Sequence, residues 1–557
     1  MNKTIRRYGW LVFAGLVAVI LLLPVKARVQ ESPQGTVLLP PPPEHQEDLN
    51  PKLDFALQRM ADIYAAEGIE KVREYAAQHK IDMKGDYIRV IAEADSGGLG
   101  SAGLQARVSI ICGEIEALGG QVETSYENLI QHLAHPGAIQ AISQLPTVRF
   151  LRLPLKPFPM ILTSEGVAKT GAGTWQAVTP YRTTEKVKVC ILDLGFKGYM
   201  SLLGTELPSS VTVKSFRADN DIEGGEVHGA ACAEIVRDMA PDADLYLVNF
   251  NTEVEHHQAV DWIIDQGVKV ISYSIGWTNA GDGKGTGPIC DDVKKASDAG
   301  IIWCNSAGNE AERHWEGIFS DSDADNWMNF SGSDQHLMTY GSKCYASMNW
   351  DDWGTWNGSS YSGSNNDYNL YLYYWSGGIW HLIDSSTGSQ NGNDWPTEFV
   401  GAWASVPLYW ALYIYKHSGT RNCKLEIFIS GSYPTEYNVP AGSISIPADS
   451  RYAVTVGATD CITDALHYYS SRGPTHDGRV KPDFTAPSGV TTQTYGDRNF
   501  YGTSAAAPHM AGAFGLISGK APFSVSQIKA ILEGRALDFG TSGKDNLYGI
   551  GRLKLTK

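Results

Sequence analysis

The run Val187-Lys188-Val189-Cys190-Ile191-Leu192-Asp193 decides the fold class of this chain. It is a short apolar segment that ends in a carboxylate, which is typical of a buried strand. Similar apolar runs follow at Leu245–Asn249, Val268–Ser274 and Ile301–Ser306, and helical segments such as Gly229–Asp238 separate them. Strands that alternate with helices predict a parallel sheet with helices on both faces.

The α/β pattern is interrupted by residues 320–440, which are dense in Asn, Ser, Gly, Trp and Tyr. Alternating runs within this stretch, such as Asn369–Tyr374 and Tyr409–Tyr415, are typical of antiparallel strands. We therefore predict an inserted all-β domain, with most of its aromatic rings in a β-sandwich core. Residues 160–319 and 441–557 are predicted to be the two parts of one interrupted α/β domain.

A separate small domain is predicted upstream, at residues 84–155. Its apolar segments follow the order β-α-β-β-α-β, a split βαβ unit. The first helix of this unit shows a regular apolar stripe at Leu104, Val108, Ile111, Ile115 and Leu118.

Residues 28–83 are predicted to be a linker and a helix. The linker is rich in Pro, Gln and Glu and contains Pro40-Pro41-Pro42-Pro43. One continuous helix is expected from about Asp54 to Gln78, because Leu57, Met60, Ala61 and Tyr64 share one face.

The N-terminus, residues 1–27, has the pattern of an export signal. A basic start is followed by the uncharged stretch Tyr8–Val25 and by Val25-Lys26-Ala27, a small-residue cleavage site. The alternative is an uncleaved membrane anchor, since this stretch is just long enough to span a bilayer. Both interpretations place the rest of the chain outside the cytoplasm, in the extracellular space or the cell envelope, and only the second involves a membrane.

Charge and cysteine content exclude several function classes. The formal net charge is −16, which disfavours binding to nucleic acid. The eight cysteines show no zinc-site spacing, and Cys190 and Cys232 lie in apolar segments as expected of buried structural thiols. Cys344 and Cys423 lie in the inserted region, where either a disulfide or two free thiols fits the sequence.

Four polar residues occupy positions where α/β proteins collect reactive groups. Asp193 ends a strand, His228 starts a helix, and Asn309 closes the string Asn305-Ser306-Ala307-Gly308-Asn309. Ser504 lies in Gly502-Thr503-Ser504-Ala505-Ala506-Ala507-Pro508-His509, where small neighbours leave room for a substrate. Taken singly, each has an ordinary structural explanation: a helix cap, a structural histidine or a turn residue. Together they have the residue types that a hydrolase would need for a nucleophile, a base, an orienting acid and an oxyanion donor.

The whole ordered set of strings resembles subtilisin-like serine proteases. The matching strings are Ile191-Leu192-Asp193-Leu194-Gly195, His228-Gly229, Ser274-Ile275-Gly276, Ala307-Gly308-Asn309, Ser471-Arg472-Gly473-Pro474, Lys481-Pro482-Asp483, Ala486-Pro487 and Gly502-Thr503-Ser504. Their order along the chain is that of the family. The resemblance covers roughly residues 165–315 and 441–550. It implies a subtilisin-like parallel sheet with helices on both faces, preceded by an α+β propeptide-like domain at 84–155.

The resemblance implies a secreted serine endopeptidase that forms an acyl-enzyme. Ser504 would be the nucleophile, His228 its base, Asp193 the residue that orients His228, and Asn309 an oxyanion donor. The implied substrate-binding residues are Ser274, Ile275, Gly276, Ala307 and Gly308. Leu194 and Ala230 depart from the family, which usually has small hydroxyl residues at these two positions.

The expected partners are protein or peptide substrates, and no cofactor is expected in catalysis. Family members often bind structural calcium, and Asp321-Ser322-Asp323-Ala324-Asp325 offers alternating oxygen ligands. The string lacks the glycine and the distal glutamate of an EF-hand loop, so a solvated acidic turn is the competing explanation.

Two other functions remain open at this stage. In the first, the chain is an inactive subtilisin-like binding protein. In the other, its main role is binding through the aromatic insertion, which contains Trp350, Trp353, Trp356, Trp375 and Trp380. If the chain is a protease, residues 84–155 are expected to act as a prodomain, with the segment Leu153–Pro159 along the active site.

Overall fold

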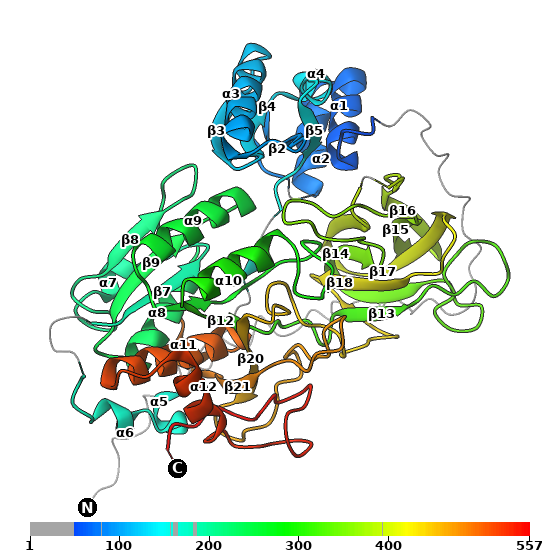
Figure 1. Cartoon of the computed structure of the whole chain (residues 1–557). Helices are drawn as coiled ribbons and strands as arrows, with labels where there is room; N and C mark the ends of the chain where they lie inside the picture. The colour runs from blue at the N-terminus through cyan, green and yellow to red at the C-terminus, as the bar shows by residue number, and fades with distance from the viewer. Residues whose placement is uncertain are drawn as a thin grey trace, which may run out of the picture. The chain divides into compact units, whose positions relative to one another are not determined.

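Three large sheets organise the described part of the chain (Figure 1). The computed structural model describes residues 50–79, 81–155, 158–159, 165–181, 186–392 and 394–556. These residues belong to one compact unit that spans Val37–Lys557. The predicted export signal at 1–27 and the start of the predicted linker lie outside the described residues. Among the described residues, no helix combines the length and the apolar character needed to cross a bilayer.

The central sheet has seven strands, all parallel, in the order β21-β20-β12-β10-β7-β9-β8. The strands are β7 (Lys188–Asp193), β8 (Thr212–Ser215), β9 (Asp244–Asn249), β10 (Val270–Tyr273), β12 (Ile302–Ser306), β20 (Ala453–Asp460) and β21 (Phe484–Ser488). The predicted parallel sheet is confirmed.

Helices cover both faces of this sheet because its strands are apolar on both faces. On β7, Val189 and Ile191 pack in one cluster with α8 (His228–Met239) and α11 (Thr503–Lys520). The alternate residues of β7, Cys190 and Leu192, pack with α9 (Glu253–Asp265) and α10 (Pro288–Asp298). The shorter helices are α5 (Val167–Thr170), α6 (Gly173–Gln176), α7 (Tyr199–Leu202) and α12 (Val525–Glu533).

The N-terminal α+β sheet has the order β1-β2-β4-β3, and β5 pairs with β2 on the edge opposite β4. Its elements are β1 (Met83–Lys84), β2 (Tyr87–Ala94), α3 (Ser101–Ala117), β3 (Gln121–Tyr126), β4 (Leu129–Ala134), the short η1 (Pro136–Ala138), α4 (Ile139–Ser143) and β5 (Val148–Arg152). Val108, Ile111 and Ile115 of the expected stripe are buried, whereas Leu118 is 37% exposed just beyond the end of α3.

The single helix expected from Asp54 to Gln78 is two helices, α1 (Phe55–Glu67) and α2 (Ile69–Gln78). Asp54 caps α1 by accepting from the backbone N–H of Ala56 at 2.8 Å. Gly68 separates the helices with φ 85° and ψ −178°, a conformation open almost only to glycine. The apolar periodicity continues across Gly68, so periodicity alone did not reveal the break.

The inserted domain is built on one seven-stranded antiparallel sheet, in the order β13-β18-β14-β17-β15-β16 with β19 beside β14. Its strands are β13 (His314–Ile318), β14 (Leu337–Trp350), β15 (Asp367–Ser376), β16 (Ile379–Ser386), β17 (Thr397–Ser418), β18 (Lys424–Ser430) and β19 (Tyr433–Pro434). Its first strand begins at His314, before the change in composition near Ser320.

A β-sandwich was expected, and the reason for the single sheet is the 22-residue strand β17. It pairs with β14 over Thr397–Leu412 and with β15 over Trp410–Ser418, so it joins both halves of the domain in one ladder. The aromatic rings divide as expected of a core: Trp350, Trp353 and Trp380 are buried, and the other two named tryptophans are partly exposed.

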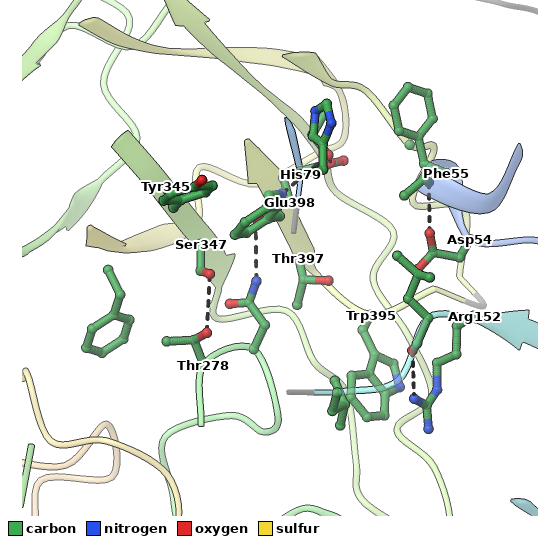
Figure 2. A pocket seen from close by; sticks show the side chains of 18 of the residues that line it. Asp54, Phe55, His79, Arg152, Thr278, Tyr345, Ser347, Trp395, Thr397 and Glu398 are labelled. Carbon is green, nitrogen blue, oxygen red and sulfur yellow. Dashed lines mark hydrogen bonds between the residues drawn. The ribbon is translucent and has the colours of Figure 1, made fainter. Parts of the chain in front are cut away.

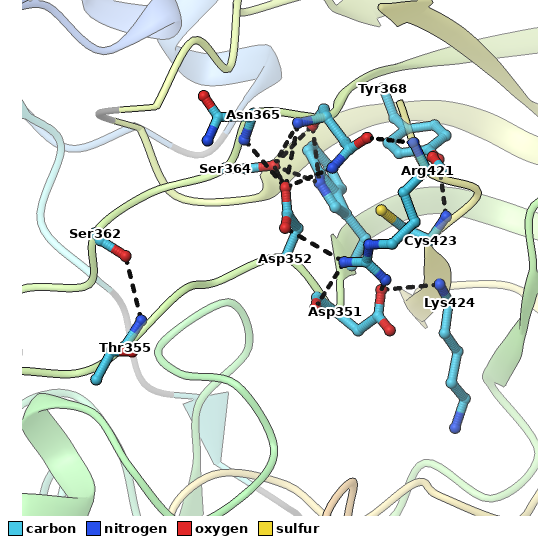
Figure 3. A network of polar contacts seen from close by, with 12 residues as sticks. Asp351, Asp352, Thr355, Ser362, Ser364, Asn365, Tyr368, Arg421, Cys423 and Lys424 are labelled. Atoms are coloured by element: carbon cyan, nitrogen blue, oxygen red, sulfur yellow. Dashed lines mark hydrogen bonds and ion pairs between the residues drawn. The ribbon is translucent and has the colours of Figure 1, made fainter. Parts of the chain in front are cut away.

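A polar network closes the loops at one end of the inserted sheet (Figure 3). Asp352 accepts from the hydroxyl of Ser364 at 2.7 Å, and the guanidinium of Arg421 bonds Asp351 at 2.8 Å. Cys423 donates its backbone N–H to the hydroxyl of Tyr368 at 2.9 Å. Cys344 and Cys423 are both free thiols buried in the same apolar cluster. Of the two alternatives left open by the sequence, the structure therefore shows the two free thiols.

Candidate active site

Asp193 and His228 meet at the carboxyl edge of the parallel sheet. Asp193 is the last residue of β7, and His228 is the first residue of α8. The Nδ1 atom of His228 lies 3.0 Å from Oδ1 and 2.9 Å from Oδ2 of Asp193, and both side chains are buried. A carboxylate in this position fixes the ring orientation and leaves Nε2 as the nitrogen suited to proton transfer.

Two local features make this approach possible. A Cβ on Gly229 would lie 2.6 Å from the carbonyl oxygen of Gly195 and 2.9 Å from Cβ of Asp193, so only glycine allows α8 to start this close to β7. Leu194, one of the departures from the family, donates its backbone N–H to Oδ1 of Asp193 at 2.8 Å. Leu194 therefore binds Asp193 through its backbone N–H, and this hydrogen bond does not depend on the side chain.

Ser504 is the second residue of α11, next to the substrate-binding segment expected at Ser274. Its Oγ donates to the carbonyl oxygen of Ser274 at 3.4 Å. Pro508 lies inside α11 and has no N–H for the carbonyl of Ser504 four residues earlier. That carbonyl accepts instead from the hydroxyl of Ser274 at 3.1 Å and from the thiol of Cys232 at 3.6 Å. The proline thus frees an oxygen that ties the start of α11 to Ser274.

Asn309 lies just after β12 with its amide oxygen turned toward α11. Oδ1 of Asn309 accepts from the backbone N–H of Thr503 at 2.9 Å and from its hydroxyl at 3.1 Å. Because the oxygen is occupied, Nδ2 points away from Thr503. An amide held in this orientation presents a donor beside the start of a helix, where negative charge is favoured.

The remaining wall residues are buried between β12 and α11. Ala307 donates its N–H to the carbonyl of Val456 at 2.9 Å, and Gly308 donates to the hydroxyl of Thr503 at 3.2 Å. Gly308 has φ 117°, and a Cβ there would lie 2.4 Å from Oγ of Ser471. Glycine is required at this turn, which places Asn309.

The edge strand β11 (Ile275–Gly276) is paired with another part of the same chain. β6 (Phe158–Pro159) runs antiparallel to it, with Pro159 opposite Ile275 and Phe158 opposite Gly276. The backbone of β11 is thus accessible to an added strand, the way an extended peptide binds a sheet edge.

Burial removes the neighbouring ionisable groups from competition with His228. It lowers the pKa of His509 to about 4, although a 2.7 Å hydrogen bond with the carbonyl of Ala505 shifts this pKa in the opposite direction. The ring of His509 is therefore neutral at pH 7. Burial also raises the pKa of the Cys190 and Cys232 thiols well above the usual value. These cysteines are neutral at physiological pH, as expected of structural thiols.

The acidic string of the insertion lies apart from these residues, in the loop between β13 and β14. Ligand oxygens of Asp321, Asp323 and Asp325 approach within 4.8 Å of one another. Most of their hydrogen bonds shape the turn itself: Asp321 accepts from the backbone N–H groups of Asp325 and Asn326, and Asp325 accepts from that of Trp327. The cluster has the geometry of a capped acidic turn, and calcium remains a prediction from the sequence.

Comparison with known proteins identifies the family. The family model described as "Subtilase family" matches residues 184–391 and 435–551, together more than half of the chain. The chain belongs to the subtilase family. Its homology is to subtilisin-like serine proteases.

Similar curated proteins match only parts of this chain. Subtilisin Savinase of Lederbergia lenta is 40% identical over 115 residues, which cover 20% of this chain and 40% of the relative. An extracellular serine protease of Serratia marcescens is 29% identical over 161 residues, 24% of this chain and 15% of the relative. The chain thus spans less than half the length of these relatives.

Among solved structures, the CspB protease of Clostridium perfringens has a TM-score of 0.49 and 14% identity, covering 70% of this chain and 97% of that chain. Fervidolysin from Fervidobacterium pennivorans has a TM-score of 0.41 and 15% identity, covering 85% and 61%.

The structure adds a residue that sequence reasoning did not single out. Thr503 joins the candidate nucleophile to both Gly308 and Asn309, through bonds that connect α11 with the end of β12. The string Gly502-Thr503-Ser504 contained it, but only the distance across the fold shows that its hydroxyl orients the amide.

Proposed function

We propose that this chain is an exported serine endopeptidase with Asp193, His228 and Ser504 as its catalytic triad. The observation that carries the proposal is the 2.9 Å contact of His228 Nδ1 with Asp193 at the sheet edge that also presents Ser504. Membership in the subtilase family supports the same assignment.

In this proposal His228 takes the proton of the Ser504 hydroxyl as Oγ attacks the substrate carbonyl, and then gives it to the leaving amine. Asp193 keeps Nδ1 protonated and stabilises the imidazolium that forms. Water then hydrolyses the acyl-enzyme with His228 as base. No cofactor is required for these steps.

Asn309 Nδ2 and the backbone N–H of Ser504 would stabilise the oxyanion. The support is the orientation of Asn309, whose oxygen is held by Thr503. A donor fixed before reaction costs little reorganisation when the charge develops. The substrate would bind as an extended strand on Ser274, Ile275 and Gly276, with Ala307 and Gly308 forming the facing wall.

Residues 84–155 are proposed to be a prodomain. Its sheet contacts the catalytic domain through α9: Gln131 accepts from the hydroxyl of Thr252 at 2.6 Å, and Arg152 forms an ion pair with Glu253. Its last strand leads toward β6, which occupies the β11 edge. A domain tethered this close blocks the cleft at high effective concentration until the tether is cut.

The register of β6 supports a specific cleavage site. In a peptide that continued this register by one residue, that residue would lie opposite Ser274, whose carbonyl oxygen is 3.4 Å from Ser504 Oγ. We therefore expect self-cleavage after Met160. N-terminal sequencing of wild type and Ser504→Ala chains tests this: only the wild type should begin at Ile161. A wild type that is fully active while retaining residues 84–155 contradicts the prodomain proposal.

Export is proposed from the N-terminal pattern of residues 1–27, and a relative described as extracellular supports it. Calcium at Asp321, Asp323 and Asp325 would be structural. Calcium-dependent thermal stability that Asp323→Asn abolishes is the expected result, and an equal melting temperature with calcium and with chelator contradicts it.

The catalytic proposal is tested by covalent labelling. A fluorophosphonate reacts only with a serine that is activated by a base, so the wild type should be labelled at Ser504 and should hydrolyse casein. Ser504→Ala should do neither. The matched control Ser526→Ala, in the exposed first turn of α12, should behave as wild type. A folded wild type that is neither labelled nor active would favour the alternative, an inactive binding protein.

A further inference from the structure

A cavity of about 1230 Å³ extends from Asn309 to the inserted sheet (Figure 2). Thr278 and Asn279 of the catalytic domain line it together with residues of the inserted domain that include Ser347, Trp395 and Phe399. Residues of the N-terminal region, among them Asp54, Phe55 and Arg152, form the rest of its wall, and in the proposed mature enzyme this part of the wall would be removed with the prodomain. The described residues just upstream of β6, Leu153–Leu155, line it as well. One cavity therefore contains the candidate oxyanion donor, the insertion and the chain that leads to the β11 edge.

The antiparallel register of β6 shows which part of a bound peptide would reach this cavity. β6 pairs with Ile275 and Gly276, so in a peptide bound this way the residues before the one opposite Gly276 would proceed toward Thr278 and Asn279. These two residues contact the insertion directly. Thr278 and Ser347 share a 3.2 Å hydrogen bond between their hydroxyls (Figure 2). Asn279 Nδ2 donates to the carbonyl of Glu398 at 3.4 Å. A peptide longer than the β11 pairing thus passes from the catalytic domain onto the inserted sheet.

Two cavity residues carry polar atoms that suit a peptide backbone. Oδ1 of Asn279 and Oε1 of Gln390 are buried and have no hydrogen-bond partner among the described residues. Both are acceptors, and an unpaired buried acceptor is costly unless a ligand satisfies it. Asn279 also has φ 55°, an uncommon backbone conformation for a residue other than glycine.

An apolar side chain completes this side of the cavity. Phe399 is 41% exposed on the part of β17 that pairs with β14 alone, and its ring stacks on that of Tyr345 at a centroid distance of 6.4 Å. Tyr345 is buried and lines the same cavity. The pair forms a preformed apolar surface beside the unpaired acceptors.

We propose that the inserted sheet is a substrate subsite for residues on the amino side of the cleaved bond, beyond those that pair with β11. Its ligand is an extended peptide with an apolar or aromatic side chain against Phe399 and with backbone N–H groups toward Asn279 and Gln390. This inference rests on the proposed protease function and assigns the insertion a part in peptide selection.

The test is a set of peptides that share three residues before the cleaved bond and the same residues after it. The long peptides carry four additional residues on the amino side, with one Phe moved through those four positions in a background of Ser. Purified wild type should cleave the best long peptide about tenfold faster in kcat/KM than the short one, the gain expected from burying most of a Phe side chain. Phe399→Ala should lose that gain and keep the short-peptide rate.

Trp403→Ala is the matched control. Trp403 lies four residues along β17 on the same face, is 60% exposed and does not line the cavity. It should keep both rates. Equal rates for long and short peptides in the wild type would overturn the inference, and so would the same loss in Trp403→Ala.

Failure of the proposed function gives a different result. If the wild type cleaves none of these peptides nor casein, the binding of the fluorescent long peptide is measured by anisotropy. Saturable binding that Phe399→Ala weakens and Trp403→Ala does not would support the subsite without catalysis. Absence of binding, or equal binding by all three proteins, would overturn it.

Discussion

Among the buried carboxylates that bind imidazole rings, Asp193 lies at the edge of the parallel sheet and Glu426 lies where the inserted sheet meets the catalytic domain. Asp193 binds a single ring, that of His228, and one backbone N–H. Glu426 on β18 binds two rings, His314 at 3.1 Å and His476 at 3.2 Å, and also the amide of Asn349 at 2.7 Å.

The second network is saturated. Nδ1 of His314 lies 2.6 Å from the carbonyl of Val439, and Nδ1 of His476 lies 3.0 Å from that of Asp282. Each ring therefore has fixed partners on both nitrogens and no means of moving a proton to a substrate. In the proposed mechanism the Asp193–His228 pair would move a proton, whereas Glu426 with its two fixed rings forms a structural clamp.

The largest expected effects are on catalysis by the Asp193–His228 pair and Ser504, and they would be absent if the pair were only structural. We expect Ser504→Ala, His228→Ala and Asp193→Ala each to lower kcat by at least about 10⁴-fold, the range measured for these roles in a subtilisin. The double variant Ser504→Ala/His228→Ala should lose hardly more than Ser504→Ala, because the groups act as one unit. Initial rates on a peptide substrate measure this, and undiminished turnover by any folded single variant removes that residue from the triad.

The oxyanion donor should give the next largest effect. In a subtilisin, loss of the asparagine donor costs about 100- to 1000-fold in kcat, and we expect a loss of that size for Asn309→Leu with little change in KM. Thr503→Val should give a smaller loss, because it removes one of two bonds that hold the Asn309 oxygen. A loss that appears only in KM would show that Asn309 binds the ground state instead.

The structural clamp should affect stability. Glu426→Gln keeps the size of the side chain and removes its charge, so we expect unfolding to become easier by about 2 kcal/mol, the range for hydrogen bonds to a charged group. Denaturant titration of the purified protein measures this. The control Glu533→Gln, at the C-terminal end of α12, should be close to neutral. Equal stability of wild type and Glu426→Gln would show that the network is not a clamp.

The smallest effect is on the pH dependence of stability. Burial lowers the pKa of His476, but the Glu426 carboxylate outweighs this and raises the pKa to about 9. Because the folded pKa lies above the unfolded value of about 6.5, this stabilisation is fully present below about pH 6.5 and is lost as the pH rises through 9.

The melting temperature of the wild type should therefore fall between pH 6.5 and 9.5 more than that of His476→Gln, as scanning calorimetry would measure. Parallel curves for the two proteins would exclude this source of pH dependence.

Sequence reasoning worked best where one residue decides a local structure. Asp193 at the end of a strand, His228 at the start of a helix and the small residues around Ser504 each carry information within a few positions. Their neighbourhood at one sheet edge follows from the parallel order of the strands, which alternation predicts. The roles assigned to these residues stay predictions until the variants are measured.

The features that sequence reasoning missed depend on backbone geometry and on contacts between distant segments. The clamp joins His314, Glu426 and His476, and Glu426 and His476 are 50 positions apart in different domains. The helix break at Gly68 depends on a backbone conformation that apolar periodicity does not encode. The single inserted sheet follows from the register of β17, which pairing partners set and composition does not.

The length of β17 affects how well the inserted domain would resist digestion by other copies of this proposed protease. A cleft that binds substrate as an added strand needs a segment whose backbone is free to pair. β17 is paired with β14 or β15 over most of its length, though not at 404–407, and over Trp410–Leu412 it is paired on both sides, so exposing that part requires opening two ladders together. We expect the strands of the inserted domain to resist self-digestion as one cooperative unit. First cuts in an ageing sample should fall in its loops.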